Sequence, residues 1–240
     1  MSYIVLFIFG IFAWFFSTLL AGGAATMLIP IVSLILGASL VAPVISIAAL
    51  IANPSRVFIF RKDIDWQVAS YILPGSVLGA ILGAWSLTKF DPSIIQLIIG
   101  FFLITYVLQD QFSRTKLSIK MRLSWFFPLG FVVSSLSGLI GATGPVHNPF
   151  MLSYGLVKER LIATKSVNSL IMQLTKIVSY GSFGLLSIEI GLYGLSLGAG
   201  AVIGVFLAKN HLQKLAVQQF RQYVMLFMFI SGITLIIKVL

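Results

Sequence analysis

The chain contains no cysteine, so disulfide bonds, thiol catalysis and thiolate-held metal sites are all excluded. Charged residues are also scarce, because only 9% of the 240 residues are Asp, Glu, Lys or Arg. An average soluble protein carries about 25%. A soluble domain with so few charges would lack the polar groups that keep a surface in water. The scarcity of charge therefore predicts that lipid surrounds most of the molecule.

The few charges that are present are mainly positive, with 16 Lys and Arg against 6 Asp and Glu. In a soluble protein this excess would suggest nucleic acid as a partner. Here the cations stand in short breaks between apolar runs, which is typical of cytoplasmic loops and of contact with anionic headgroups. We expect the lipid bilayer as a partner and no nucleic acid.

Ten apolar segments follow one another along the chain. Most are long enough to cross the ~30 Å hydrocarbon core, which takes about 20 helical residues. The second and the seventh have only about 12 residues and would reach ~18 Å, so each is expected to enter the membrane partway. The segments are 3–21, 26–37, 40–60, 66–88, 92–109, 123–140, 145–157, 161–184, 188–208 and 220–237.

The second half of the chain repeats the first at an offset near 120 residues. Both short segments follow a glycine-rich break, and each contains a proline, Pro30 and Pro149, which lie 119 residues apart. Further matches in the same order are Gly37 with Gly155, Gly79-x3-Gly83 with Gly200-x3-Gly204, and Asn53-x2-Arg56 with Gln173-x2-Lys176. The chain is therefore predicted to be an all-α membrane protein with two repeats of about five segments, 1–112 and 123–240, joined by a cytoplasmic linker at 113–122.

Loop charges orient the segments, because Lys and Arg gather in cytoplasmic loops. Four cations mark the linker as cytoplasmic: Arg114, Lys116, Lys120 and Arg122. Counted from there, segment 40–60 runs from outside to inside and its counterpart 161–184 runs the other way. The repeats are thus expected to be inverted, each opening with a re-entrant hairpin. The predicted localisation is the cell (inner) membrane, multi-pass, with both termini extracytoplasmic.

Inverted repeats with broken helices point to a transporter with a site near the midplane. The first turn of each short helix leaves N–H groups unpaired at a positive dipole end, so two such ends favour an anion. Pro145 is expected to take the first position of the second short helix. The candidate substrate contacts at the two hairpin tips are Gly22, Gly23, Thr26, Thr143, Gly144, His147 and Asn148.

Close helix packing is the alternative explanation for these glycines. It is the one we adopt for Gly75, Gly79, Gly83, Gly200 and Gly204.

Polar groups inside the third and eighth segments complete the candidate site. Asn53 and Gln173 lie near the centres of their segments, with Arg56 and Lys176 three residues later on the same helical face. Charges inside a span usually face an aqueous cavity. We hypothesise that the two cations attract the anion and help to gate it. Extension of these long side chains to the headgroups is the alternative for both.

A coupled proton or cation is an open question at this stage. His147 is the one histidine inside an apolar segment, and it can carry a proton, donate to an anion or hydrogen-bond backbone. The six acids all lie at segment ends, so a membrane-buried carboxylate relay is not expected.

The hairpin sequences resemble the paired signatures of the TauE/SafE sulfite exporter family. They run from Gly22 to Pro30 (GGAATMLIP) and from Gly141 to Phe150 (GATGPVHNPF). The resemblance extends over essentially the whole chain through its two halves. It implies a multi-pass transporter of sulfur-containing anions such as sulfite, sulfonates or sulfoacetate.

Two other classes of function were weighed against a secondary transporter. A membrane enzyme would need more than Ser137-Gly138 and His147, which lack an orienting acid; no metal-site or nucleotide-loop spacing occurs either, so we expect no enzyme and no cofactor. A passive anion channel stays open, because inverted repeats and cationic vestibules serve channels as well. The chain is predicted to carry a small anion by alternating access.

Overall fold

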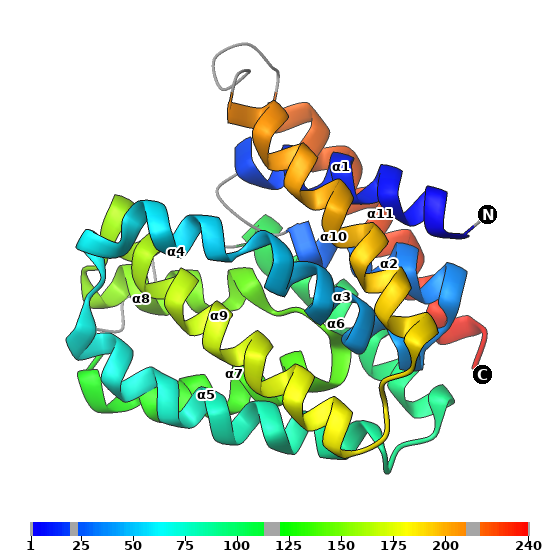
Figure 1. Cartoon of the computed structure of the whole chain (residues 1–240), viewed down its shortest axis with the longest axis horizontal. Helices are drawn as coiled ribbons and strands as arrows, with labels where there is room; N and C mark the ends of the chain where they lie inside the picture. Colours follow the sequence, from blue (N-terminus) through cyan, green and yellow to red (C-terminus); the bar gives the residue numbers. More distant parts are fainter. Residues whose placement is uncertain (1, 20–23, 113–120, 210–216, 240) are drawn as a thin grey trace.

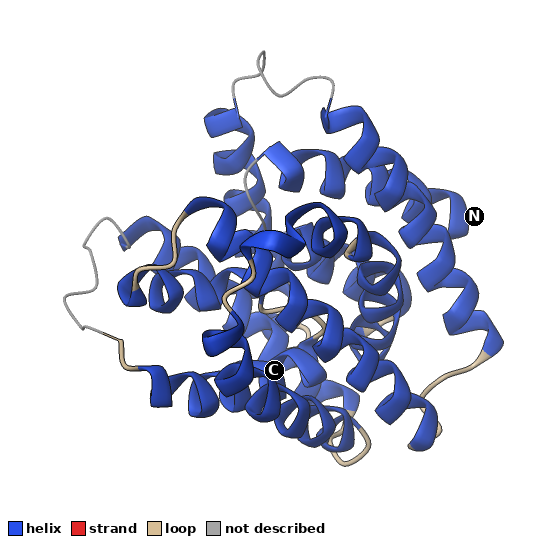
Figure 2. Ribbon diagram, turned by 60° about the vertical axis from the view of Figure 1, so that its left-hand side comes forward, coloured by secondary structure: helices blue, strands red, loops and turns tan. Residues whose placement is uncertain are grey.

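The computed structural model describes residues 2–19, 24–112, 121–209 and 217–239. Within these ranges the chain forms helices joined by short loops and no strand (Figure 2), which confirms the all-α prediction. The helices are α1 (Ser2–Leu19), α2 (Ala24–Leu36), α3 (Ala38–Ala52), α4 (Pro54–Phe60), η1 (Arg61–Asp63), α5 (Trp66–Leu87), α6 (Pro92–Phe112), η2 (Leu123–Trp125), α7 (Phe126–Ile140), η3 (Gly144–His147), α8 (Asn148–Tyr154), α9 (Lys158–Ser182), α10 (Ile188–Lys209) and α11 (Val217–Ile237).

Four stretches of helix in the described ranges are long and apolar enough to cross a membrane: Trp66–Leu87, Pro92–Gln109, Leu123–Ile140 and Ile188–Ala208. Large apolar side chains also face outward on these helices; Phe206, for example, is 68% exposed. Extended apolar surface of this kind is unfavourable in water and ordinary in lipid. The chain is a multi-pass membrane protein, as its composition predicted.

Two of the expected segments are divided where proline interferes with the helix. Segment 40–60 is two helices, α3 and α4, because Pro54 has no N–H to continue the ladder and stands at the first turn of α4, directly after Asn53. Segment 145–157 is the 3₁₀ turn η3 followed by the seven-residue α8, whose first turn holds Pro149. The prediction that Pro145 takes the first position of an α-helix is therefore wrong. Gly37 and Gly155 end α2 and α8 with positive φ, as expected.

Each short helix folds back along the helix that precedes it. Ser2 at the start of α1 and Leu36 at the end of α2 line one pocket of about 420 Å³, so these two ends lie together. In the second half, the rings of Phe126 at the start of α7 and Tyr154 at the end of α8 are in edge contact, 5.2 Å between centroids. Both opening pairs are thus hairpins.

The two halves of the chain interlock through close helix crossings. α5 packs along α7 and α10 packs along α1, so each crossing joins the first half to the second (Figure 1). A Cβ at Gly79 would lie 2.1 Å from the Phe131 carbonyl oxygen, and one at Gly200 would lie 2.1 Å from that of Phe7. Only glycine permits this approach, which confirms that these glycines serve helix packing.

At these crossings the helix contacts pair the two halves of the chain one helical turn away from the pairing in the sequence match. Gly75 lies against the Phe127 carbonyl and Gly200 against the Phe7 carbonyl, and these two phenylalanines are 120 residues apart. Gly75 and Gly200 therefore occupy corresponding places, whereas the sequence match pairs Gly79 with Gly200. In α1 and α7 the corresponding glycines are Gly10 and Gly130, which are 120 residues apart. A Cβ at either would lie within 2.5 Å of a carbonyl oxygen of the facing helix.

Helices α3 and α9 form the centre of the molecule. They contact each other, α10 packs on α3 and α5 packs on α9, while α6 and α11 form a further pair. α9 is the longest helix described and is the least apolar of those that run through the interior. Its buried polar residues are Thr164, Ser166, Asn168, Gln173, Lys176 and Ser179. A polar helix enclosed by apolar ones is the natural place for a site within the membrane.

The crossing of α5 and α7 yields the first prediction. Gly79→Ala places a methyl against backbone and should lower the free energy of unfolding by about 1–3 kcal/mol, because the helices must separate. Gly191→Ala in α10 is the matched control, since a Cβ there meets no atom within 4 Å. Thermal unfolding of the detergent-solubilised protein, followed by tryptophan fluorescence, measures both. Equal unfolding temperatures for the two variants would contradict the close packing.

Candidate functional site

The candidate site is built around the tip of the second hairpin. α7 ends at Ile140 and is capped by Gly141, whose φ of 100° suits glycine and whose N–H donates to the Ser137 carbonyl at 2.9 Å. The chain then turns back, and the buried Thr143 hydroxyl donates to the Val133 carbonyl at 3.1 Å. The tip is therefore held inside the protein. The last carbonyls of α7 have no partner within their own helix and can accept hydrogen bonds from neighbouring side chains.

Lys176 of α9 meets those carbonyls. Its Nζ donates to the Gly141 carbonyl at 2.8 Å and lies 3.3 Å from Oγ of Ser137. The side chain is fully buried, so it does not extend to the headgroups. A cation at the C-terminal end of a helix is favourable, because the last carbonyls are unpaired and carry the negative end of the dipole.

Tyr180, one turn further along α9, holds the same end of α7. Its hydroxyl donates to the Gly138 carbonyl at 2.5 Å, and the ring is fully buried. Two side chains of α9 thus fix the position of the hairpin tip relative to the central helix.

Two other polar groups of α9 are buried without a hydrogen-bond partner among the described residues. They are Oε1 of Gln173, a residue only 3% exposed, and Oδ1 of Asn168. Leaving a buried polar atom unpaired typically costs about 1–3 kcal/mol, so such atoms in the interior mark places where a ligand or water completes the structure. Gln173 lies three residues before Lys176 and hence on the same face of the helix.

Asn53 sits at the break between α3 and α4 and joins the two halves. Its Nδ2 donates to Oγ of Ser169 at 3.0 Å. The sequence placed Asn53 near the middle of one continuous helix; the structure places it at the end of α3, where Pro54 follows. Its amide nitrogen is therefore engaged by α9.

The other predicted residues near the tips fall into two groups. Thr26 in α2 and His147 in η3 are buried, and their Oγ1 and Nε2 atoms have no partner in the described part of the chain. Asn148 accepts a hydrogen bond from Nζ of Lys165 at 2.7 Å. The structure brings Lys176 to the carbonyl of Gly141, two residues before Thr143. Gln173 lies three residues before Lys176 in α9.

Several predicted residues lie outside what the structure describes. These are Gly22 and Gly23, the linker from 113 to 120, the side chain of Arg56 and the solvent exposure of Gly144.

Sequence reasoning missed the partners of Lys176. Ser137 was considered only as half of a serine–histidine pair, and its hydroxyl instead lies at the buried ammonium. Tyr180 and Ser169 were not considered at all. One signal was present, because Ser137, Gly138 and Gly141 form the last turn of the helix before a break, where unpaired carbonyls attract donors.

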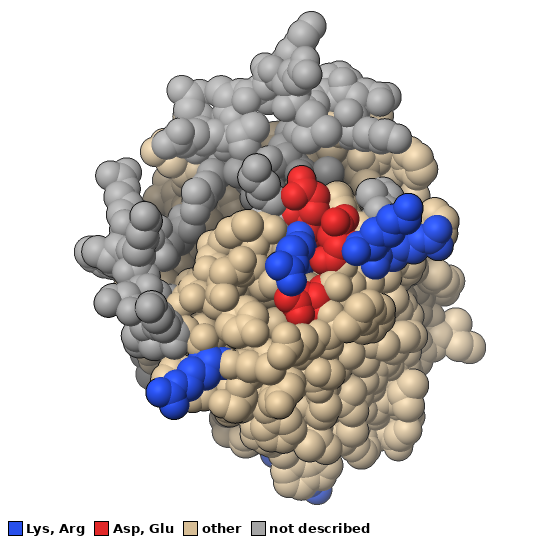
Figure 3. Space-filling model, turned by 90° about the vertical axis from the view of Figure 1, so that its left-hand side faces the viewer, with Lys and Arg blue, Asp and Glu red and all other residues tan. Residues whose placement is uncertain are grey.

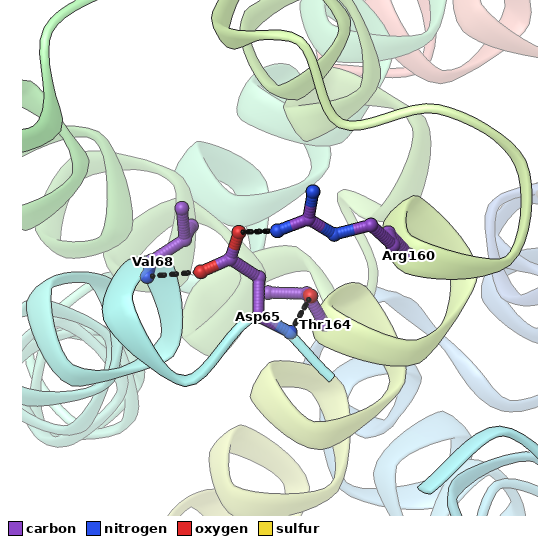
Figure 4. Close-up of polar contacts among 4 residues, drawn as sticks. All are labelled: Asp65, Val68, Arg160 and Thr164. Carbon is purple, nitrogen blue, oxygen red and sulfur yellow. Dashed lines mark hydrogen bonds and ion pairs between the residues drawn. The ribbon is translucent and has the colours of Figure 1, made fainter. Parts of the chain in front are cut away.

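A second polar cluster joins the halves at the end of the molecule where α5 and α9 begin. Asp65 caps α5 by accepting from the Val68 N–H at 3.0 Å, and its other carboxylate oxygen pairs with Arg160 at 2.6 Å (Figure 4). Its own N–H donates to Oγ1 of Thr164 at 2.9 Å. Figure 3 looks onto this end, where acidic and basic side chains gather on an otherwise largely uncharged face.

The hydrogen bond of Tyr180 gives a prediction about the hairpin tip. Tyr180→Phe should lower the free energy of unfolding by about 1 kcal/mol or more, because the Gly138 carbonyl loses a buried donor. Tyr71→Phe is the matched control, since Tyr71 is exposed on α5. Thermal unfolding in detergent checks this, and a control as destabilised as the test variant would argue against the contact.

The Asp65 cluster gives a second prediction. Asp65→Asn keeps an oxygen that caps α5 and loses only the ion pair, which is worth little because Arg160 is 61% exposed. Asp65→Ala loses the cap as well and should cost about 1 kcal/mol more. Chemical denaturation of the two variants compares the losses; equal losses in the two would show that the ion pair dominates and the cap contributes little.

Comparison with known proteins is in line with this geometry. The sequence profile of the family described as Sulfite exporter TauE/SafE matches residues 6–235, which takes in every helix from α1 to α11. No match was found among the curated proteins or among the solved structures. The match extends over nearly the whole chain and includes both hairpins, α9 and the residues around Lys176. The chain therefore belongs to the sulfite exporter TauE/SafE family of membrane transporters.

Proposed function

We propose that the chain is a secondary transporter of small sulfur-containing anions that bind beside Lys176, between the two halves. The observation that carries this is the burial of Lys176 with two uncharged partners, the Gly141 carbonyl and the Ser137 hydroxyl. No carboxylate in the described ranges lies within ion-pair distance of it. A buried charge without a counter-charge is strongly unfavourable, and a small oxyanion would supply one.

Inverted repeats are the second part of the proposal. The start of α7 packs with α5 in the cluster that includes Val68 and Phe126. The start of α1 lies instead by the start of α10, because Ser2 and Glu189 line one pocket. α1 starts at the end of the molecule opposite to the start of α5 (Figure 1). These contacts support two hairpins that enter from opposite sides, as expected of inverted repeats at 1–112 and 123–240. The cytoplasmic linker and the extracytoplasmic termini in an inner membrane rest on the loop charges.

Alternating access follows from this arrangement. The second helix of each hairpin, α2 or α8, is too short for a full crossing, and each hairpin is held by helices of the other half. Relative movement of the halves would therefore open the site to one side and then to the other. Thr143 and Gln173 would line the site with Lys176. Thr26, Asn53 and Arg56 would contribute from the first half, together with the glycines of both tips, Gly22, Gly23 and Gly144.

His147 is the proposed place of a coupled proton. Its buried Nε2 has no partner in the described ranges, and the next residue, Asn148, is bound by Lys165. An imidazole nitrogen without a partner can accept a proton. A bound cation is the alternative coupling partner.

The proposal is tested by anion binding and uptake. Purified protein should be stabilised against heat by sulfite, sulfate, thiosulfate, sulfoacetate or taurine and not by acetate. Lys176→Met should abolish this stabilisation and reduce uptake into proteoliposomes by at least about tenfold, because the charge that holds the anion is removed. Lys89→Met is the control, since Lys89 is exposed and its Nζ lies over the Trp85 ring.

Three outcomes distinguish a carrier, a passive channel and a protein that transports no anion. Saturable, slow uptake that depends on Lys176 supports the carrier. Unitary currents in planar bilayers would assign a passive channel instead. If no oxyanion stabilises or crosses, the anion reading fails.

A further inference from the structure

Two amides at repeat-related positions are used differently in this structure. Asn53 donates its Nδ2 hydrogen bond to Ser169, across the boundary between the halves. Gln173, which is 120 residues later, is buried and its Oε1 has no partner among the described residues. Asn53 thus uses the N–H donor of its amide, whereas the atom left open in Gln173 is the carbonyl acceptor.

A comparison of the two repeats attributes the open carbonyl of Gln173 to one hydroxyl group that the first half lacks. If Asn53 corresponds to Gln173, then Ser169 of α9 corresponds to Ala49 of α3, again at an offset of 120. Ala49 is buried and carries only a methyl group, so the position that corresponds to Ser169 offers no O–H that could donate to Oε1 of Gln173.

The offset of 120 holds at other points of these two helices. Oγ of Ser46 donates to the Ala42 carbonyl, and Oγ of Ser166 donates to that of Ile162, so both members of each bond are related by 120. α3 and α9 also contact each other directly. The correspondence between Ser169 and Ala49 therefore rests on the register of the central helices as well as on the sequence.

We infer that Gln173 is the residue that selects the substrate, and that Ala49 keeps its amide open for this purpose. This inference rests on the proposed function. Lys176, on the same face of α9, supplies the positive charge that any small anion would use. Gln173 adds an acceptor that only some anions satisfy, because its unpaired atom is a carbonyl oxygen.

The inference names a substrate class. The expected substrate is an anion that also carries a hydrogen-bond donor, such as a protonated oxyanion or a sulfonate with a hydroxyl or ammonium group. Its negative charge pairs with Lys176, and its donor binds the carbonyl oxygen of Gln173. An anion of the same size without a donor leaves the carbonyl of Gln173 buried and unpaired. Sites that hydrogen-bond a substrate group discriminate against analogues that lack it for this reason.

The asymmetry also assigns Asn53 a different role. With its amide bound to Ser169, Asn53 fixes the junction of α3 and α4 against α9 and is a positioning residue. The two halves then contribute unequally: the first half braces the site and the second selects the ligand.

The test uses two sulfonates of similar size, isethionate, which has a terminal hydroxyl, and propane-1-sulfonate, which has a methyl group in its place. Wild-type protein in detergent should bind isethionate about threefold to tenfold more tightly, the worth of one buried hydrogen bond. Gln173→Met should still bind both and lose the preference.

Ala49→Ser supplies the missing hydroxyl without touching the ligand. A hydroxyl both donates and accepts, so it should engage the Gln173 amide, raise the unfolding temperature and reduce the preference for isethionate to about twofold or less. Ala49→Cys is the matched control, because a thiol has nearly the same shape and is a weak hydrogen-bonding group. It should keep the wild-type preference.

The outcomes separate this inference from the proposed function. If the wild-type protein binds neither sulfonate nor sulfite, the proposed function fails. If it binds both sulfonates equally, or if the serine and cysteine variants behave alike, Gln173 is not the selecting residue and the transporter proposal stands. If Ala49→Ser does not fold, the relative affinity of Gln173→Met for the two sulfonates tests the inference instead.

Discussion

The contact between Lys176 and the last carbonyl of α7 is the interaction on which the rest of the site depends. A broken helix inside a membrane protein leaves backbone carbonyls with no water to bind, and each must find a donor within the protein. Lys176 provides one at Gly141, and Tyr180 provides another at Gly138. The same contact brings a positive charge into the interior with no carboxylate in the described ranges to balance it. Under the proposed function, the anion pairs with this buried charge.

The interlocked halves explain how such a site is kept in place. The glycine crossings bring α5 against α7 and α10 against α1 at backbone distance, so each hairpin is supported by the opposite half. Attraction between helices in lipid comes from close packing rather than from the exclusion of water, and small residues are what make it possible. The polar faces of α9 and α3 are then enclosed at the centre. Apolar side chains fill much of the interior and also face outward, where a soluble protein would be polar.

Much of the fold could be predicted from the sequence, because segment lengths and small-residue spacing are local. Most of the segments, the hairpins and the role of Gly79 and Gly200 in packing belong to this group, whereas segments 40–60 and 145–157 are each divided in the structure. The break at Asn53 was also visible in principle, since Pro54 follows it, but a continuous apolar run concealed it. The sequence match of the two repeats was one turn off at the α5 and α10 crossings, because glycines three or four residues apart look alike in either register.

The site was less predictable, because its contacts join residues far apart in the chain. Lys176 was singled out as a cation within a span, but its partner lies 35 residues earlier and depends on how α9 crosses the end of α7. The bond from Asn53 to Ser169 spans 116 residues. Polar residues inside a membrane segment can be found from the sequence. Only the packing of the helices shows which of them have hydrogen-bond partners within the protein.

The central claim is that an anion balances the buried charge of Lys176. Selenite, the selenium analogue of sulfite, allows a direct measurement by X-ray anomalous diffraction from crystals of the complex. The account predicts a selenium peak beside Lys176, with an oxyanion oxygen within about 4 Å of its Nζ, the range of an ion pair. A peak confined to another place, such as the pocket near Glu189, with none beside Lys176, would contradict it.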